Sequence, residues 1–260
     1  MPRVLALLVL VLSLAACATS PTGRDQLRLY SSAQMERMGQ SAFSEIKRRN
    51  AVVEDPAMQR YVTCVADAIT RVVAPGQDWE VVVFDEESAN AFALPGGKIG
   101  VHSGMLEVAA TQDQLAAVLA HEVAHVEAEH GNARMSAAAA TQIGLSAVAV
   151  LLGGEARDRE QVMALLGVGA QVGILLPYGR SQESEADRLG LEYMARAGFD
   201  PRASIALWQN MERAGGGQPP EFLSTHPSHA TRISDLRAGM PAALERYRRA
   251  QARGRVPDCR

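Results

Sequence analysis

The sequence predicts a mostly helical α+β domain with one small β-sheet or hairpin. Helical patterns with recognisable caps occupy most of the 260-residue chain, and strand signals are confined to residues 79–102. No internal repeat of the helical-hairpin type is present, so no repeat domain is expected. We therefore expect one folded domain over residues 31–240.

The composition is that of a globular protein with ample material for a core. Hydrophobic residues make up 47% of the chain, and the formal net charge is −3. That charge gives no long-range attraction to phosphate backbones, and no basic stripe interleaved with aromatic residues is present. Nucleic acid is therefore not an expected partner.

The first 16 residues have the layout of a secretory signal peptide, with one positive charge, an apolar run over Val4–Leu12 and small residues before Cys17. The ending Leu-Ala-Ala-Cys resembles a bacterial lipoprotein signal, which implies cleavage before Cys17 and lipid modification of that cysteine. Ala18 resembles the residue found at this position in lipoproteins sorted to the outer membrane. A plain signal peptide or an anchor helix is the alternative.

Residues 17–30 are polar and broken by Pro21 and Gly23, which predicts a disordered tether between a lipid anchor and the folded domain. If Cys17 carries lipid, Cys64 and Cys259 form an even pair in an oxidising compartment. A disulfide between them and two free thiols both remain open, because the sequence does not give the distance between their Cα atoms.

Four helices are predicted, three of them from cap signals. One covers about Ser32 to Arg49, and the next begins at Asp55-Pro56, with aspartate as N-cap and proline at the first helical position. Another covers about Ser181 to Ala197 and is stopped by Gly198. A fourth begins at Asp200-Pro201 with the same cap arrangement.

Strand signals form one group. Trp79–Asp85 is a β-branched run short enough for a strand. Two extended pieces, Ala91–Leu94 and Lys98–His102, are joined through Pro95-Gly96-Gly97, which predicts a hairpin. The long apolar region 136–176 is interrupted by charged residues, so we expect paired helices against the core or over the active site; membrane spans are the alternative.

A further helix, capped by Thr111 and stopped at Gly131, carries titratable residues inside an apolar run. On a helix His121 and His125 lie about 40° apart on one face, close enough for both imidazoles to bind one ion. Glu122 lies beside that position, where it can take a proton from a metal-activated water. This H-E-x-x-H pattern predicts a catalytic metal site, and two coincidental histidines are the alternative.

A tetrahedral catalytic zinc needs a third protein ligand. The longer pattern with a third ligand in the same segment is excluded, because Ala128 and Gly131 occupy the relevant positions. His130 lies about 180° round a continuous helix from His121, so it is predicted to face away and to have a helix-end role.

The segment 180–190 offers carboxylates early in a helix. Glu183 and Asp187 are four residues apart and share a face, so one can bind the metal while the other fixes a ligand imidazole. Glu185 is predicted to point elsewhere. A solvated acidic helix start is the alternative.

Four ordered blocks of sequence resemble one family. His121-Glu122-x-x-His125 is followed by Glu183-x-x-x-Asp187 in the setting ESEADRLG, with NAFALPGGKIGVHSGML at 90–106 and STHPSHATRI at 224–233. This order resembles the family of zinc peptidases that includes HtpX, the CAAX prenyl protease and the bacterial envelope proteases BepA and LoiP. The resemblance covers about 31–240 and implies a mostly helical zincin-type (gluzincin) domain with its small sheet or hairpin beside the zinc site.

The resemblance also implies roles for individual residues. Glu183 would be the third zinc ligand, and Asp187 would hold a ligand histidine. His226 would lie near the metal, either as a transition-state donor or as a removable fourth ligand that silences the enzyme; a surface-loop histidine is the alternative. Arg232 would help to hold the polar network. An edge strand that pairs with an extended substrate would consist of Ala91, Phe92 and Ala93.

Taken together, the resemblance implies one Zn²⁺ per chain, held by His121, His125 and Glu183, in an endopeptidase on the inner face of the outer membrane. Its expected substrates are misfolded or misassembled envelope polypeptides, with the outer-membrane assembly machinery as a further partner. The alternative is a chaperone-like assembly factor with a structural or silenced zinc site. The chain most resembles compact lipoprotein members of the LoiP kind. We interpret its basic tail, 241–260, as a solvated helix end, with contact to anionic lipid as the weaker alternative.

Overall fold

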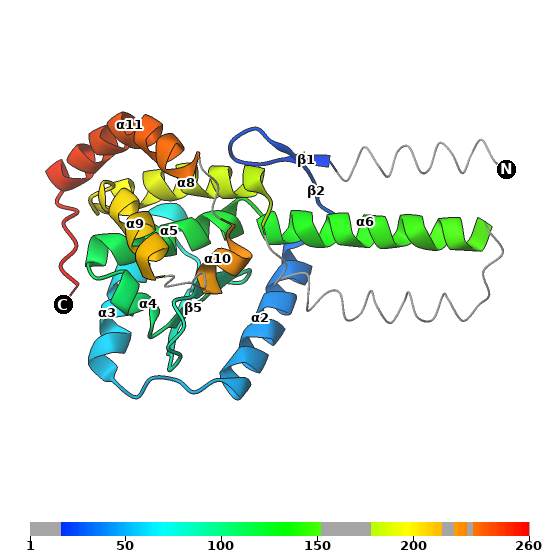
Figure 1. Cartoon of the computed structure of the whole chain (residues 1–260), viewed down its shortest axis with the longest axis horizontal. Coiled ribbons are helices and arrows are strands. Elements are labelled where there is room, and N and C mark those ends of the chain that lie inside the picture. The colour runs from blue at the N-terminus through cyan, green and yellow to red at the C-terminus, as the bar shows by residue number, and fades with distance from the viewer. Residues whose placement is uncertain (1–16, 152–177, 215–220, 228–230, 260) are drawn as a thin grey trace.

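The computed structural model describes residues 17–151, 178–214, 221–227 and 231–259. Most of these residues are helical, and the strands form one three-stranded sheet and one two-stranded hairpin (Figure 1). The predicted α+β fold class is therefore confirmed.

One helix, α5 (Gln112–Glu127), forms the centre of the molecule. It is apolar on nearly every side, and its residues from Gln114 to His125 are all buried, as expected of a helix surrounded by other elements. Figure 1 shows α8 over α5 and α11 outside α8, with the sheet on the other side. The helices packed around α5 or its neighbours are α3 (Pro56–Val73), α8 (Arg180–Ala197), α9 (Ala203–Ala214) and α11 (Arg232–Ala252).

The sheet has the order β3-β5-β4. β3 (Glu80–Phe84) pairs in parallel with β5 (Lys98–His102), and β5 pairs antiparallel with β4 (Ala91–Leu94) through the tight turn between them. β4 is therefore an edge strand, and it packs against α5. This arrangement brings one strand edge beside the histidines of the central helix.

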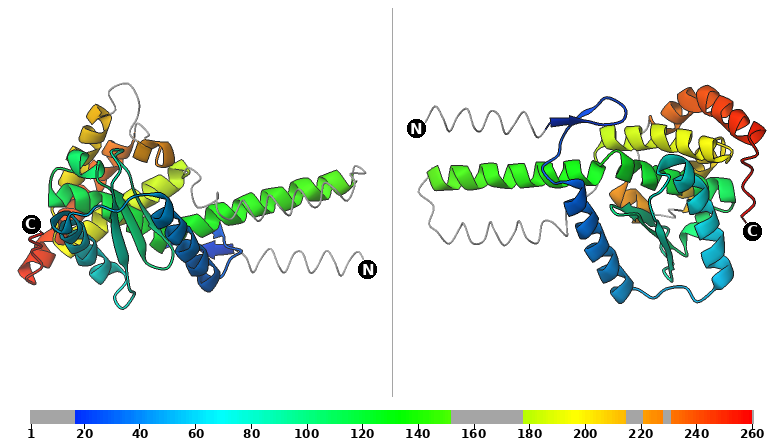
Figure 2. Two further views of the ribbon diagram at one scale, coloured as in Figure 1. Left: turned by 90° about the horizontal axis from the view of Figure 1, so that it is seen from below. Right: turned by 180° about the vertical axis from the view of Figure 1, so that it is seen from behind.

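The remaining elements lie around this core. They are β1 (Cys17–Thr19), β2 (Asp25–Leu27), α2 (Ser32–Arg49), α4 (Met105–Val108), α6 (His130–Leu151) and α10 (Glu221–Thr225). Of these, α6 projects from the body in every view (Figure 2).

Local sequence signals predict several boundaries correctly. The helix Ser32–Arg49 and the hairpin Ala91–Leu94 with Lys98–His102 have the predicted bounds. Asp55 caps α3 through its side chain, which accepts from the backbone N–H of Ala57 at 2.8 Å. Gly198 ends α8 with a φ of 98°, a conformation that glycine adopts readily.

The predicted end of the central helix at Gly131 is wrong. α5 ends at Glu127, Glu129 takes a φ of 52°, and α6 starts at His130. A left-handed residue turns the chain sharply, so the residues that follow do not continue the face of α5. His130 consequently points in a direction that a continuous helix does not predict.

The predicted disorder of residues 17–30 is also wrong. β1 and β2 form an antiparallel hairpin. Its side chains bond to the domain: Gln26 Nε2 donates to Ala128 O at 3.0 Å, and Thr22 Oγ1 donates to Glu185 at 2.7 Å. The polar residues from which a tether was predicted are therefore hydrogen-bond partners of buried groups in the domain.

The C-terminal region is tied to the core. Cys64 in α3 and Cys259 form a disulfide across a sequence separation of 195 residues, so the bridged alternative holds. α11 continues through residue 240, where the domain was expected to end, and its Ala243 and Ala250 are buried. Residues beyond 240 thus contribute to the packed structure.

The long apolar region is described only in part. Its first half belongs to α6, and the second half lies outside the described residues. Within the described ranges, no helix is both long enough and apolar enough to cross a membrane.

Candidate metal centre

The centre of the site comes from α5. His121, Glu122 and His125 are each at most 3% exposed, although they carry polar groups. The helix can bury them because its remaining positions are almost all Ala, Val or Leu, which pack on every side. Burying such groups is costly unless they have partners or a bound ion.

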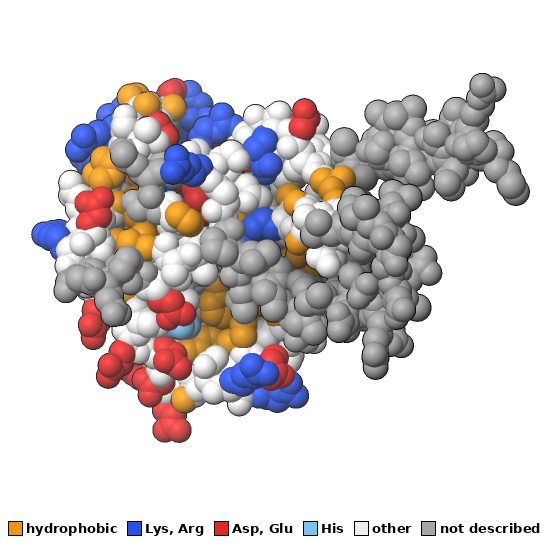
Figure 3. Space-filling view, turned by 45° about the vertical axis from the view of Figure 1, so that its right-hand side comes forward, with side chains coloured by type: hydrophobic (Ala, Val, Ile, Leu, Met, Phe, Trp, Pro, Cys, Tyr) orange, Lys and Arg blue, Asp and Glu red, His pale blue; other side chains and the backbone are white. Residues whose placement is uncertain are grey.

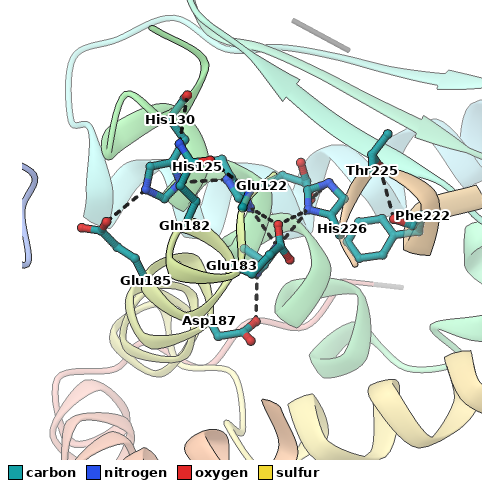
Figure 4. Close-up of polar contacts among 12 residues, drawn as sticks. Glu122, His125, His130, Gln182, Glu183, Glu185, Asp187, Phe222, Thr225 and His226 are labelled. Atoms are coloured by element: carbon teal, nitrogen blue, oxygen red, sulfur yellow. Dashed lines mark hydrogen bonds and ion pairs between the residues drawn. The ribbon is translucent and has the colours of Figure 1, made fainter. Parts of the chain in front are cut away.

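A second helix brings carboxylates to these histidines. α8 packs closely on α5, because Gly190 leaves no side chain between them: a Cβ there would lie 3.0 Å from Cα of His121. Glu183 Oε1 lies 3.4 Å from His125 Nε2 (Figure 4), and Asp187 Oδ1 lies 3.0 Å from His121 Nδ1. The sequence prediction that these two carboxylates share a face toward the histidines is confirmed in geometry.

His226 completes the cluster. It follows α10, its backbone N–H donates to Phe222 O at 2.9 Å, and its ring stacks on that of Phe222. Its Nδ1 lies 3.1 Å from Glu183 Oε1 and 3.3 Å from His121 Nε2. The alternative of a surface-loop histidine is therefore wrong, because His226 is buried at the centre.

Four donor atoms converge on one point. The donors come from His121, His125, Glu183 and His226, and they lie within 4.8 Å of one another. His121 Nε2 lies 3.0 Å from His125 Nε2 and 3.3 Å from His226 Nδ1, and Glu183 Oε1 lies 3.4 Å and 3.1 Å from the same two nitrogens. Zinc–ligand distances of about 2.0–2.1 Å at tetrahedral angles require donor separations of about 3.3 Å. Three imidazoles and one carboxylate at these spacings fit a tetrahedral divalent ion.

Glu122 lies beside this cluster and is not part of it. Its Oε1 is buried and accepts no hydrogen bond from the described residues, and His226 Nε2 lies 3.4 Å from it. The backbone of Ala93 in β4 bonds to the same carboxylate. Burial raises the pKa of Glu122, and the nearby His226 and His121 oppose this rise.

Arg232 neutralises the carboxylates behind the cluster. Its guanidinium is 1% exposed, lies over the Trp208 ring, and contacts Glu183 Oε2 at 3.0 Å and Asp187 Oδ2 at 2.7 Å. Burial alone raises the pKa of Asp187, but the charge of Arg232 and the bond to His121 bring it below its usual value. The predicted role of Arg232 in the polar network agrees with these contacts.

The helix-end role predicted for His130 is wrong, whereas Glu185 does point away from the donor cluster, as predicted. His130 Nδ1 lies 2.9 Å from His125 Nδ1, and His130 Nε2 lies 3.1 Å from Glu185 Oε2 (Figure 4). His130 is buried behind His125, because the turn at Glu129 redirects the chain, and Glu185 reaches it from α8. Burial lowers the pKa of His130 to about 4, while Glu185 opposes this shift.

Tyr178 has no counterpart in any sequence motif. Its backbone N–H donates to Thr225 O at 2.9 Å, and its ring centroid lies 3.7 Å from that of His125. Arg134 lies over the other side of the ring. Burial raises the pKa of Tyr178 to about 12. The ring therefore shields the ligand imidazoles from water as a neutral phenol.

Two cavities follow β4 on either side of Tyr178. One, of about 310 Å³, is lined by the edge residues Ala91, Phe92 and Ala93 together with Glu122 and His226. The other, of about 210 Å³, is lined by Ala93 to Gly96, His125 and Tyr178. Figure 3 shows one face where hydrophobic side chains gather beside a histidine and acidic groups. The order β3-β5-β4 leaves the second edge of β4 unpaired among the described strands, so an extended peptide can pair there.

The fold and the site define a class: a zincin-type metallopeptidase domain, with two helical histidines four residues apart, a buried glutamate beside them and a carboxylate from a second helix. The chain belongs to peptidase family M48, whose model matches residues 54–239. The family suggested by the sequence blocks is thereby confirmed.

Curated relatives agree with this assignment. The chain is 34% identical to the mitochondrial metalloendopeptidase OMA1 of Schizosaccharomyces pombe over 86% of its own length and 64% of the relative's. It is 32% identical to human OMA1 over 86% of its length and 44% of the relative's. It is 27% identical to the beta-barrel assembly-enhancing protease of Escherichia coli over 78% of its length and 43% of the relative's. The chain thus spans between 43% and 64% of the length of these proteins.

Proposed function

We propose that this protein is a zinc-dependent endopeptidase that cleaves misfolded or misassembled polypeptides of a bacterial cell envelope. The observation that carries the proposal is the position of Glu122. This buried carboxylate lies between a four-donor metal cluster and a strand edge that can hold a peptide. A purely structural metal site would not require a buried carboxylate beside it that coordinates nothing.

The residues divide the chemistry among them. His121, His125 and Glu183 would hold a zinc ion, which would supply Lewis-acid polarisation to a substrate carbonyl and to the attacking water. Glu122 takes the proton of that water and passes it to the leaving amine. The edge of β4 holds the peptide backbone extended, which gives main-chain hydrogen bonds and little sequence selectivity. Unfolded chains are the substrates that can adopt this conformation.

The test is cleavage of reduced casein by the purified, zinc-loaded full chain, with Glu122→Gln as the matched variant. We expect the parent to cleave casein and Glu122→Gln to lose at least about 100-fold in rate, while zinc content measured by atomic absorption stays at one per chain. Equal cleavage by both proteins would identify a contaminant and refute the role of Glu122.

A second candidate function is supported by His226. Its Nδ1 takes the fourth corner of the donor cluster, which a catalytic site keeps open for water or substrate. A chaperone-like assembly factor with a silenced site shares this arrangement. It predicts that Glu122→Gln leaves function in the envelope unchanged.

The cellular location is also part of the proposal. The lipoprotein-like ending before Cys17 and the similarity to a beta-barrel assembly-enhancing protease support a lipid anchor on the periplasmic face of the outer membrane. The outer-membrane assembly machinery is the corresponding partner.

Labelling tests the anchor. Both proteins are expressed in a Gram-negative host grown with radioactive palmitate. The parent should carry label and Cys17→Ser should carry none, because the lipid is attached through the sulfur atom of the cysteine. A labelled Cys17→Ser protein, or an unlabelled parent, would contradict the proposal.

A further inference from the structure

The ligand His125 has a hydrogen-bond partner behind it. Its Nε2 faces Glu183 and His121 in the donor cluster, while its Nδ1 lies 2.9 Å from His130 Nδ1. His130 is completely buried, and its other nitrogen, Nε2, lies 3.1 Å from Glu185 Oε2. The two ligand histidines are therefore supported differently: His121 by Asp187 directly, and His125 through a second histidine.

Metal binding would decide which atom donates and which accepts in each of these contacts. A ligand nitrogen must present its lone pair, so a metal-bound Nε2 leaves the proton of His125 on Nδ1. That N–H can donate to His130 only if His130 Nδ1 is unprotonated. The proton of His130 then lies on Nε2 and is donated to the Glu185 carboxylate. In both contacts, a ring N–H then faces an acceptor atom.

Glu185 is in turn held by the N-terminal hairpin. Arg24 Nε contacts its Oε2 at 2.8 Å, and Thr22 Oγ1 donates to its Oε1 at 2.7 Å. The side chain of Glu185 is 3% exposed, so these bonds act where solvent screening is weak. They fix the carboxylate where its Oε2 lies 3.1 Å from His130 Nε2.

The same hairpin also holds the turn that presents His130. Gln26 Nε2 donates to Ala128 O at 3.0 Å, one residue before the left-handed Glu129. From α8, Gln182 Nε2 donates to His130 O at 3.3 Å. Both the side chain and the backbone of His130 are thus fixed from outside its own helix.

We infer that His130 and Glu185 position the imidazole of the metal ligand His125, and that the hairpin at residues 17–27 holds them through Arg24 and Thr22. The inference rests on the proposed metal role of His125. The hairpin, which was predicted to be part of a disordered tether, would thus help to hold the metal site. Outer partners of this kind change metal affinity by about 10- to 100-fold when they are removed.

The experiment measures zinc affinity of the full chain by competition with a chromogenic chelator at neutral pH. His130→Leu removes the acceptor for His125, and His130→Asn replaces it with an amide oxygen near the position of Nδ1. We expect His130→Leu to bind zinc about 10- to 100-fold more weakly and His130→Asn to recover most of that loss. The visible absorption of the cobalt-substituted proteins should shift in His130→Leu and return toward the parent in His130→Asn.

Arg24→Met tests the hairpin, and Lys47→Met is its matched control. The side chain of Lys47 is about as exposed as that of Arg24, and it joins α2 to Glu80 of β3, away from the proposed metal ligands. We expect Arg24→Met to lower zinc affinity and Lys47→Met to leave it unchanged. Arg24→Met keeps the partly exposed position filled with a flexible side chain, so it tests the hairpin even if His130→Leu does not fold.

Three outcomes would overturn the inference. Parent-like zinc affinity in His130→Leu would remove the positioning role of His130. Identical behaviour of His130→Asn and His130→Leu would reduce the contact to packing, and parent-like affinity in Arg24→Met would remove the share of the hairpin. His121→Ala is the control for the metal site itself, and it should bind zinc more weakly than the parent. If His121→Ala binds zinc as the parent does, the proposed metal site has failed; if it binds more weakly, a parent-like result in the other variants refutes only the positioning inference.

Discussion

At the scale of single residues, His226 decides between an open and a closed centre. Its Nδ1 occupies a corner of the donor tetrahedron, and its Nε2 faces Glu122. In this arrangement the histidine stands where an attacking water would be needed. Movement of the His226 side chain alone would open the fourth coordination position, without any movement of α5 or α8.

Replacement of His226 by alanine should therefore raise casein cleavage. If about one tenth of the parent molecules are open at any time, the initial rate rises by about tenfold. Zinc affinity should fall in the same variant, because one donor is lost. The double variant His226→Ala with Glu122→Gln should cleave nothing, and a single variant slower than the parent would instead make His226 a transition-state donor.

The sequence predicted these ligands better than it predicted their supports. The shared face of His121 and His125 follows from helical spacing, which depends only on local geometry, whereas the ligand role of Glu183 was implied by the resemblance to the zinc peptidases. His130 was misplaced because its direction depends on the φ of 52° at Glu129, a non-glycine residue without a turn signal. A histidine directly after a long apolar helix was the available clue in the sequence.

At the scale of elements, the approach of α8 to α5 sets the distance between carboxylates and histidines. Gly190 lies against backbone atoms of His121, which cannot rotate away as a side chain can. The N-caps of α3 and α5 are encoded locally and were predicted. The hairpin β1–β2 was not predicted, because its polar residues are ordered by partners more than 100 positions away.

Gly190→Ala should destabilise the fold by about 1–3 kcal/mol, because the added Cβ lies 3.0 Å from the backbone of His121. Zinc affinity should fall as well, since His121 and Glu183 are pushed apart. Chemical denaturation and chelator competition measure the two effects. Gly131→Ala is the matched control: its nearest contact is Met35 Cε at 3.9 Å, so helix propensity should make it neutral or stabilising. Equal unfolding free energies for Gly190→Ala and the parent would contradict the close approach.

At the scale of the whole molecule, the disulfide joins the C-terminal end of the chain to the core. Cys64 lies in α3, beside the core, and Cys259 follows α11 at the far end of the chain. The sequence left this bond open, because pairing depends on the distance between the cysteines in the folded state.

Cys259→Ser should lower the free energy of unfolding by about 2–5 kcal/mol, because the unfolded chain is no longer closed into a loop of nearly 200 residues. Guanidinium denaturation of the full chain measures this change. The parent with a reducing agent should lose the same amount, and Cys64→Ser with Cys259→Ser should lose no more than either single variant. Unchanged denaturation midpoints in all of these proteins would show that the bridge does not form.

The wide spacing of the site along the chain also governs when activity can begin. Glu122 and the first two metal ligands leave the ribosome well before Glu183, and Arg232 and Cys259 come later still. A growing chain therefore carries the H-E-x-x-H helix without the carboxylates and the arginine that complete the centre. The order of synthesis itself thus delays proteolysis until the residues from Glu183 to Arg232 have been made.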